Sequence, residues 1–148
     1  AIFRYFENCD EIWHAGDFGT IDIASRLAAF KPLRGVFGNI DGYDVRSVYP
    51  ESLRWACEQV EVLMTHIGGY PGKYTPAVRE QMKATPPQLF ICGHSHILKI
   101  MYDKQYACLH INPGAAGKQG WHQMRTIVRF AVDGKEMKDC EVIELGKR

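Results

Sequence analysis

Apolar residues recur at helical spacing in three segments of the chain. Residues 20–30 carry a regular apolar stripe, and Thr20 or Asp22 can cap its start. Residues 76–84 begin with a proline, which suits the first position of a helix. A weaker stripe covers residues 1–8. We therefore predict helices over these three segments.

Short apolar runs bounded by glycine, proline and polar pairs predict strands in the rest of the chain. Single strands are predicted over 11–17, 33–38 and 88–96. Hairpins are predicted over 52–66, 97–114 and 124–145. Residues 67–75 are predicted to be a loop, because IGGYPGKY holds three glycines and a proline.

The order of these elements places helices in the first half and hairpins in the second. This order favours an α/β fold with two packed sheets over a simple doubly wound sheet. A chain of 148 residues fits one domain, which we place over 1–148. No internal repeat, linker or low-complexity segment divides it.

Composition narrows the class of protein. The chain has 18 Lys and Arg against 17 Asp and Glu, so no basic stripe favours a nucleic-acid partner, whereas a small phosphorylated ligand is compatible. Five cysteines without a C-x-x-C pair indicate free thiols in a reducing compartment. No apolar run approaches the roughly 20 residues of a membrane helix. We expect a cytoplasmic protein without membrane association.

Four predicted strands end in side chains that can bind a metal. The segments are Gly16-Asp17, Gly38-Asn39, Thr65-His66 and Gly93-His94-Ser95-His96. One carboxylate, one amide and three imidazoles suit divalent ions such as Mn²⁺, Fe²⁺, Zn²⁺ or Ni²⁺. A carboxylate such as Asp17 can bridge two ions about 3.5–4 Å apart. The amide of Asn39 can ligate through oxygen and donate from nitrogen to a phosphate.

Each signal alone also has an ordinary structural explanation. Asp17 and Asn39 stand in common turn pairs, and His66 can be a satisfied histidine at a strand edge. The H-x-H pair of His94 and His96 is more specific. The metal site is predicted from the combination rather than from any single residue.

Three other histidines carry weaker signals. His14 precedes Gly16-Asp17, and it is either an ordinary strand residue or a second-shell group that orients a ligand. His110 is expected to be structural. His122, beside Trp121, can lie over the mouth of the site, but we do not assign it.

The motifs HAGD, GNID, MTH and GHSH, in this order over 14–96, closely resemble the calcineurin-like metallophosphoesterase superfamily. INPGAAG at 111–117 resembles the INPGS-type loop of its small bacterial and archaeal branch. The resemblance implies a four-layer α-β-β-α sandwich with two mixed β-sheets and a site at their carboxyl edges. Asp17 would bridge two metals, and the other ligands would divide between them: Asn39, His66 and His94 on one metal, His96 on the other.

The function implied by this resemblance is metal-dependent hydrolysis of phosphodiester or phosphomonoester bonds by a hydroxide that two divalent ions activate. Mn²⁺ is the first expectation, with Ni²⁺, Fe²⁺ or Zn²⁺ as alternatives. Asn39 and His66 are expected to act in catalysis by stabilising charge on the phosphoryl oxygens. The expected substrate is a phosphorylated small molecule, and a homo-oligomer is compatible.

Two departures from the family pattern favour an alternative. The opening D-x-H motif, on a first strand, has no counterpart in the sequence, so that strand is expected to be missing. Ile40 stands where the family carries a proton-donating histidine, and Asp41 is a candidate substitute that contacts substrate. The alternative function is a calcineurin-like scaffold with little or no activity that binds protein partners, as in retromer-type subunits.

Overall fold

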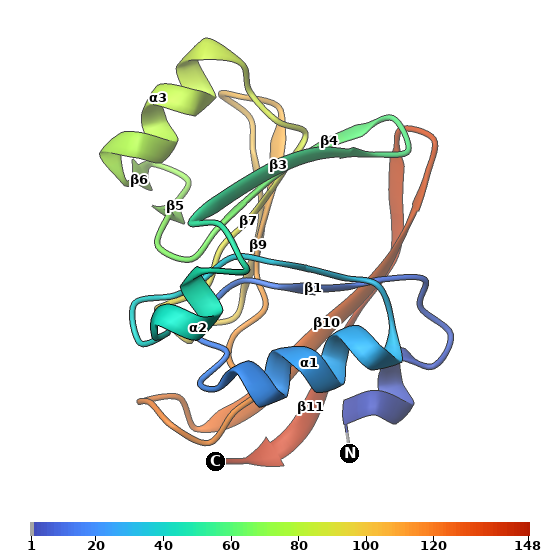
Figure 1. The fold of residues 1–148 in the computed structure, drawn as a ribbon. Helices are drawn as coiled ribbons and strands as arrows, with labels where there is room; N and C mark the ends of the chain where they lie inside the picture. The colour runs from blue at the N-terminus through green and yellow to red at the C-terminus, as the bar shows by residue number, and fades with distance from the viewer. Residues whose placement is uncertain (1) are drawn as a thin grey trace.

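The computed structural model describes residues 2–148, and Figure 1 shows the order of its elements. The helices are a 3₁₀ helix at Ile2–Phe6, α1 at Ile21–Phe30, α2 at Tyr43–Arg46 and α3 at Pro76–Ala84. The strands are β1 (Ile12–His14), β2 (Leu33–Gly35), β3 (Ser52–Cys57), β4 (Val60–Thr65), β5 (Gly69–Tyr70), β6 (Lys73–Tyr74), β7 (Leu89–Ile91), β8 (Lys99–Asp103), β9 (Cys108–Asn112), β10 (Met124–Asp133) and β11 (Glu136–Lys147).

The predicted helices and hairpins are confirmed, with differences at their ends. Thr20 caps α1, because its hydroxyl oxygen accepts a hydrogen bond from the Ile23 N–H at 3.3 Å. The helix predicted over 1–8 is a 3₁₀ helix, and Ala1 lies outside the described residues. The single four-residue turn of α2 was not predicted, because it is too short to show an apolar period.

The loop prediction for 67–75 is wrong in part. Two-residue strands β5 and β6 pair antiparallel there, with Gly69 opposite Tyr74 and Tyr70 opposite Lys73. The glycines make this hairpin possible rather than preventing it, because Gly69 and Gly72 have φ of 80° and 88°. Such positive φ angles close a short turn at little cost.

One five-stranded mixed sheet and three two-stranded ladders form the β-structure of the described residues. The five-stranded sheet has the order β3-β4-β7-β9-β8, in which β4, β7 and β9 run parallel. The short ladders are the parallel pair β1–β2 and the antiparallel pairs β5–β6 and β10–β11. The fold is therefore α/β with mixed sheets, as predicted.

The β1–β2 and β10–β11 ladders do not join into the second continuous sheet that was expected. Side chains connect them instead: Trp13 of β1 packs edge-on against Phe130 of β10, with ring centroids 5.5 Å apart. Trp13 packs in the same way against Trp55 of β3, at 5.0 Å. Aromatic rings thus pack between β1 and the two strands β3 and β10.

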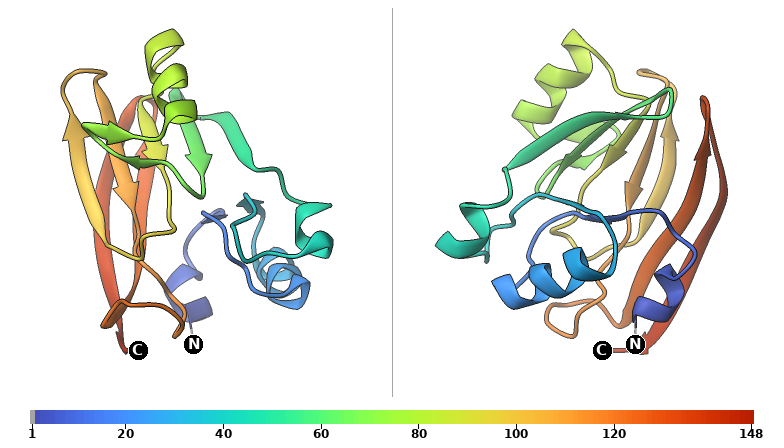
Figure 2. Two further views of the ribbon diagram at one scale, coloured as in Figure 1. Left: turned by 90° about the vertical axis from the view of Figure 1, so that its left-hand side faces the viewer. Right: turned by 45° about the vertical axis from the view of Figure 1, so that its right-hand side comes forward.

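Three apolar clusters hold the elements together. The first lies between the five-stranded sheet and β10–β11, around Val62, Met64 and Leu89. The second lies under α3, whose Val78 and Met82 pack on the sheet. The third lies between α1 and β1–β2, where the contacts include Ile12, Phe18, Ala24, Leu27 and Val45. Figure 2 shows α1 and α2 gathered around β1–β2, apart from α3.

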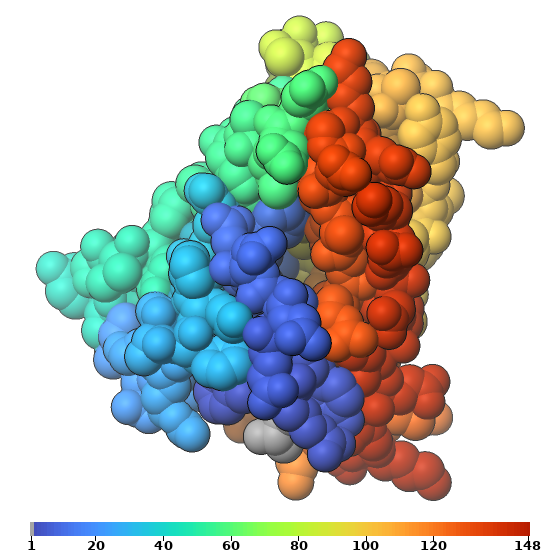
Figure 3. Space-filling model, turned by 90° about the vertical axis from the view of Figure 1, so that its right-hand side faces the viewer, coloured from blue at the N-terminus to red at the C-terminus, as the bar shows by residue number. Residues whose placement is uncertain are grey.

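The C-terminal hairpin ties the two halves of the chain together. Figure 3 shows it running past the β3–β4 hairpin and the N-terminal elements. The Gln59 N–H donates to the Gly134 carbonyl at 2.8 Å, and the Arg129 guanidinium donates to the Tyr5 carbonyl at 2.7 Å. Among the helices of residues 2–148, none has the length and hydropathy of a membrane-spanning segment.

Candidate metal centre

Parallel pairing brings the predicted ligands to one edge of the fold. β1 and β2 run parallel, so the loops that carry Asp17 and Asn39 leave them at the same end. β4 and β7 also run parallel, and His66 and His94 follow their carboxyl ends. Because a rigid ladder fixes each strand end, four loops far apart in sequence converge.

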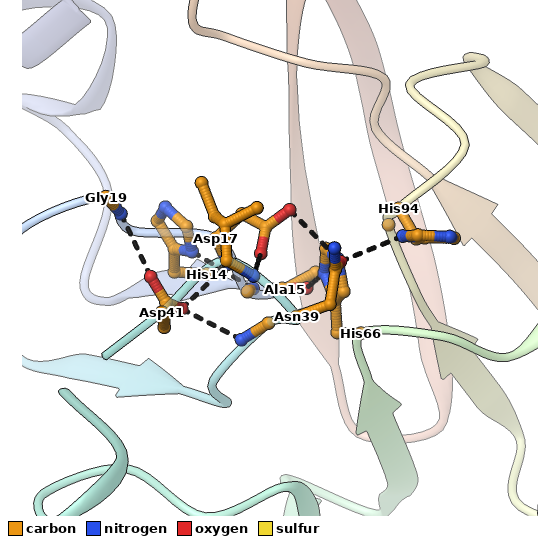
Figure 4. Close-up of polar contacts among 12 residues, drawn as sticks. His14, Ala15, Asp17, Gly19, Asn39, Asp41, His66 and His94 are labelled. Atoms are coloured by element: carbon orange, nitrogen blue, oxygen red, sulfur yellow. Dashed lines mark hydrogen bonds and ion pairs between the residues drawn. The ribbon is translucent and has the colours of Figure 1, made fainter. Parts of the chain in front are cut away.

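The side-chain polar atoms of four of the five predicted ligands lie within contact distance of a neighbour in the set (Figure 4). His66 Nε2 lies 2.9 Å from Asn39 Oδ1 and 3.1 Å from Asp17 Oδ2. His94 Nδ1 lies 3.0 Å from the same Asn39 oxygen. His96 sits on the same turn as His94 but makes no hydrogen bond with the other four within the described chain. The structure thus gathers Asp17, Asn39, His66 and His94, and leaves His96 beside them.

The protonation of His66 shows why this arrangement fits a cation. Its Nδ1 lies 2.7 Å from the Ala15 carbonyl oxygen, which can only accept, so Nδ1 carries the proton. In the neutral ring, Nε2 then presents a lone pair to the carboxylate of Asp17. Two electron-rich atoms 3.1 Å apart are stabilised by a positive charge between them. A backbone carbonyl on the far nitrogen is also the usual support of a metal-bound imidazole.

The amide of Asn39 is an essential part of this donor set. Among residues 2–148, no three His, Cys, Asp or Glu side chains form a group that could hold a metal by themselves. The Asn39 oxygen supplies the missing donor, because it lies within 3.0 Å of two imidazole nitrogens. Mixed oxygen and nitrogen donors fit Mn²⁺, Fe²⁺, Zn²⁺ or Ni²⁺.

Backbone strain concentrates on the predicted ligands. Asp17, His94 and His96 have φ of 63°, 69° and 61°, in the left-handed region that non-glycine residues rarely occupy. Such conformations cost about 1–3 kcal/mol each and persist where surrounding contacts impose them. Three of the strained non-glycine residues of the described chain are therefore candidate ligands.

Two glycines make the close approach of these loops possible. A Cβ on Gly16 would lie 2.5 Å from His66 Nδ1, and a Cβ on Gly38 would collide with the Asp17 carboxylate. The glycines of the GD and GN motifs thus leave the space in which the side chains of Asp17 and His66 pack.

Asp41 holds the two N-terminal loops of the site together. Its carboxylate oxygens accept the N–H groups of Gly38 at 2.8 Å, Asp17 at 2.9 Å and Gly19 at 3.0 Å. Burial raises the pKa of this carboxyl, but hydrogen bonds from four backbone N–H groups outweigh burial and lower the pKa below its ordinary value. Asp41 is therefore an ionised clamp, 3% exposed, and its contact with a substrate stays a prediction.

His14 acts on the backbone rather than on a ligand side chain. Its Nδ1 accepts the Gly16 N–H at 3.1 Å, and its ring stacks on Phe18 with centroids 3.8 Å apart. Burial lowers the pKa of His14 to about 4, so the ring stays neutral and keeps this lone pair available. His14 thus shapes the Gly16-Asp17 turn.

Asn112 supports the turn that carries His94 and His96. Its amide nitrogen donates to the Gly93 carbonyl at 3.0 Å and to Ser95 Oγ at 3.1 Å. Its oxygen accepts the Gly114 N–H at 3.0 Å. This role of Asn112 was not predicted, although its place at the end of a strand, before Pro and Gly, was a signal.

The surroundings of the site are partly apolar. Ile40 is 57% exposed, and its N–H donates to Asp17 Oδ1 at 3.0 Å. Behind the His94 turn lies a cavity of about 160 Å³, lined by residues that include Tyr70, Ser95 and Lys99. The loop 67–75 therefore borders the histidine turn through Tyr70, whereas Tyr74 points inward and donates to Asp103 at 2.6 Å.

The chain combines an α/β fold with a converging set of Asp, Asn and two His side chains at the sheet edges. This combination is typical of metal-binding phosphoesterases. The chain belongs to the calcineurin-like phosphoesterase superfamily, since the model of that superfamily domain matches residues 1–135. The family is metal-dependent, and metallophosphoesterase activity is the function that membership implies. The resemblance found in the sequence motifs is confirmed.

Individual proteins support the same assignment. A protein from Methanothermobacter thermautotrophicus named probable metallophosphoesterase is 29% identical over 147 residues, covering 99% of this chain and 82% of its own length. The structure of an archaeal phosphodiesterase superposes with a TM-score of 0.74 at 19% identity, covering 97% of this chain and 88% of that one. Zinc-bound Vps29 from Entamoeba histolytica gives a TM-score of 0.68 at 14% identity, over 97% and 87% of the two chains. At these identities the two structures show the fold alone.

Proposed function

We propose that the protein hydrolyses phosphodiester bonds in small phosphorylated molecules, with two bound divalent cations. The observation that carries this proposal is that His66 Nε2 lies 2.9 Å from Asn39 Oδ1 and 3.1 Å from Asp17 Oδ2. The likeness to the archaeal phosphodiesterase and to the probable metallophosphoesterase supports it. The balanced charge of the chain favours a small substrate over a nucleic acid.

The residues that would hold the first ion are Asp17, Asn39, His66 and His94. Asp17 and His96 would hold the second. When bound, such cations lower the pKa of water and neutralise charge on phosphoryl oxygens. We take Mn²⁺ as the first candidate, and the zinc-bound Vps29 structure keeps Zn²⁺ as an alternative.

The chain's own side chains would fix the geometry of the reaction. Ala15 holds the His66 ring in one tautomer, and the Ile40 N–H holds one oxygen of Asp17. The Asn39 amide nitrogen is the group of this set that can donate to a phosphoryl oxygen. His66, 4% exposed, is expected to act through the ion that it would hold, because its one N–H already donates to the Ala15 carbonyl.

The leaving group is expected to depart without a protonated side chain to assist it. Ile40 occupies the position of the family's proton donor, and Asp41 is an ionised clamp. Loss of a general acid typically slows hydrolysis by about 10²–10⁴-fold, and less for acidic leaving groups. We therefore propose that aryl phosphodiesters are better substrates than alkyl esters or phosphomonoesters.

A protein-binding scaffold is the second candidate function. Ile40 is 57% exposed and Tyr43 is 85% exposed, so the segment after Asn39 presents apolar surface to solvent. A scaffold, however, has no need for a buried histidine whose lone pair faces a carboxylate. Metal content separates the two candidates, since close to two equivalents per chain support the enzyme and none supports the scaffold.

The test is hydrolysis of an aryl phosphodiester by the purified protein with Mn²⁺. We expect turnover that Asp17→Ala and His94→Ala each reduce by at least about 10²-fold, because each change removes a metal ligand. Asp10→Ala is the matched control, since this exposed carboxylate lies outside the site. Absence of turnover in the metal-loaded wild type, or an unchanged rate in both site variants, contradicts the proposal.

A further inference from the structure

His122 lies against His96, the candidate ligand that stands apart from the other four. The two imidazole rings meet edge to face, with centroids 5.0 Å apart and an interplanar angle of 83°. His122 comes from the segment between β9 and β10, after the INPG turn. The family resemblance does not assign this position to the site.

The contacts of His122 fix which of its nitrogens is free. Its Nε2 lies 2.8 Å from the Gly117 carbonyl oxygen, so Nε2 carries the proton and donates. In the neutral ring, Nδ1 then presents a lone pair. This atom is buried and has no hydrogen-bond partner among the described residues. An orphaned buried acceptor of this kind is costly unless something binds to it.

Gly120 leaves a space between the two rings. Its φ is 124°, and a Cβ at this position would collide with His96 Nδ1 and lie 3.1 Å from His122 Nδ1. Both Nδ1 atoms thus border the same small volume. A larger residue at 120 would fill it.

His96 Nδ1 and His122 Nδ1 are two imidazole nitrogens that border one small space beside the candidate centre. Imidazole nitrogens suit the same divalent ions as the first site.

We propose that His122 is a metal ligand that shares with His96 the second divalent ion. The proposal rests on the proposed function, because it needs a metal centre at Asp17. The Gly117 carbonyl then serves His122 as the Ala15 carbonyl serves His66, by holding the ring in the metal-binding tautomer.

Calorimetric titration of the metal-free full chain with Mn²⁺ tests this assignment. Wild type is expected to bind two ions. His122→Ala is expected to keep the first site and to weaken the second on the order of 10²-fold. Trp121→Ala is the matched control, since Trp121 is 98% exposed and adjoins His122 in sequence. Gly120→Ala retains His122 but fills the space, so we expect it to weaken the second site as well.

A second readout does not depend on affinity. X-ray absorption of the Zn²⁺-loaded chain is expected to count one imidazole fewer per two ions in His122→Ala than in wild type or Trp121→Ala. Unchanged stoichiometry, affinity and imidazole count in His122→Ala overturn the inference and leave the proposed function standing. A wild type that binds no metal overturns both.

Discussion

At the scale of single residues, the centre depends on positions that carry no reactive group. Gly38 has an ordinary φ, yet a Cβ there would collide with both the carboxylate and the backbone nitrogen of Asp17. Gly16 leaves similar room for His66. The small residues that precede the candidate ligands are thus as necessary to this geometry as the candidate ligands themselves.

Gly38→Ala tests this dependence. The added methyl group must displace Asp17, so we expect Mn²⁺ affinity to fall by about 10-fold or more and stability to fall by about 1–3 kcal/mol. Gly117→Ala is the matched control, because a Cβ there meets nothing within 4 Å and its φ is not positive. Calorimetric titration and urea unfolding measure both effects. Equal behaviour of the two variants would contradict the steric explanation.

The sequence predicted which side chains would converge, but not how they are supported. Asp17, Asn39, His66 and His94 were identified because each follows a predicted strand. The clamp formed by Asp41 was not, because its backbone donors come from two loops whose approach depends on the tertiary fold. The pairing of His96 with His122 has the same origin. Neither the Asp41 clamp nor the His96–His122 pair can be recognised from neighbouring residues in the sequence.

At the scale of elements, local signals predicted most of the helices and hairpins. Apolar spacing and a capping threonine were sufficient for α1, and a first-position proline for α3. The β5–β6 hairpin was missed because two-residue strands show no alternation. The separation of the ladders β1–β2 and β10–β11 was not predicted, because the aromatic packing between them is not visible in either strand alone.

The two threonine caps offer a matched test of local signals. Thr20 Oγ1 accepts the Ile23 N–H, so we expect Thr20→Ala to cost about 1 kcal/mol of stability. Thr75 stands at the same position of α3, but its hydroxyl is buried without a partner and makes no capping bond. Thr75→Ala is therefore expected to cost less. Urea unfolding of both variants measures these costs. A larger loss of unfolding free energy for Thr75→Ala than for Thr20→Ala would contradict the expectation.

At the scale of the whole molecule, a buried histidine couples stability to pH. His110 of β9 is 1% exposed and stacks on Phe90 with ring centroids 5.2 Å apart. Burial lowers the pKa of His110 from 6.5 to about 4. The folded protein therefore keeps the ring neutral in a pH range where the unfolded chain takes up a proton.

Because the pKa of His110 is lower in the folded protein than in the unfolded chain, acidification lowers the free energy of unfolding. Above pH 6.5 the ring is neutral in both states and has no effect, whereas stability falls as the pH drops from 6.5 to about 4. The loss from this residue is about 3 kcal/mol. In His110→Phe, urea unfolding between pH 7 and 4.5 is expected to show a shallower loss. Parallel curves for wild type and variant would show that His110 does not contribute.

The central claim is that loops at the carboxyl ends of β1, β2, β4 and β7 create one divalent-metal centre. The most direct test is a crystal structure of the Mn²⁺-soaked protein with anomalous data collected near the manganese edge. We predict an anomalous peak bounded by Asp17 Oδ2, Asn39 Oδ1, His66 Nε2 and His94 Nδ1. A map from fully soaked crystals without a peak among these four atoms would contradict the claim.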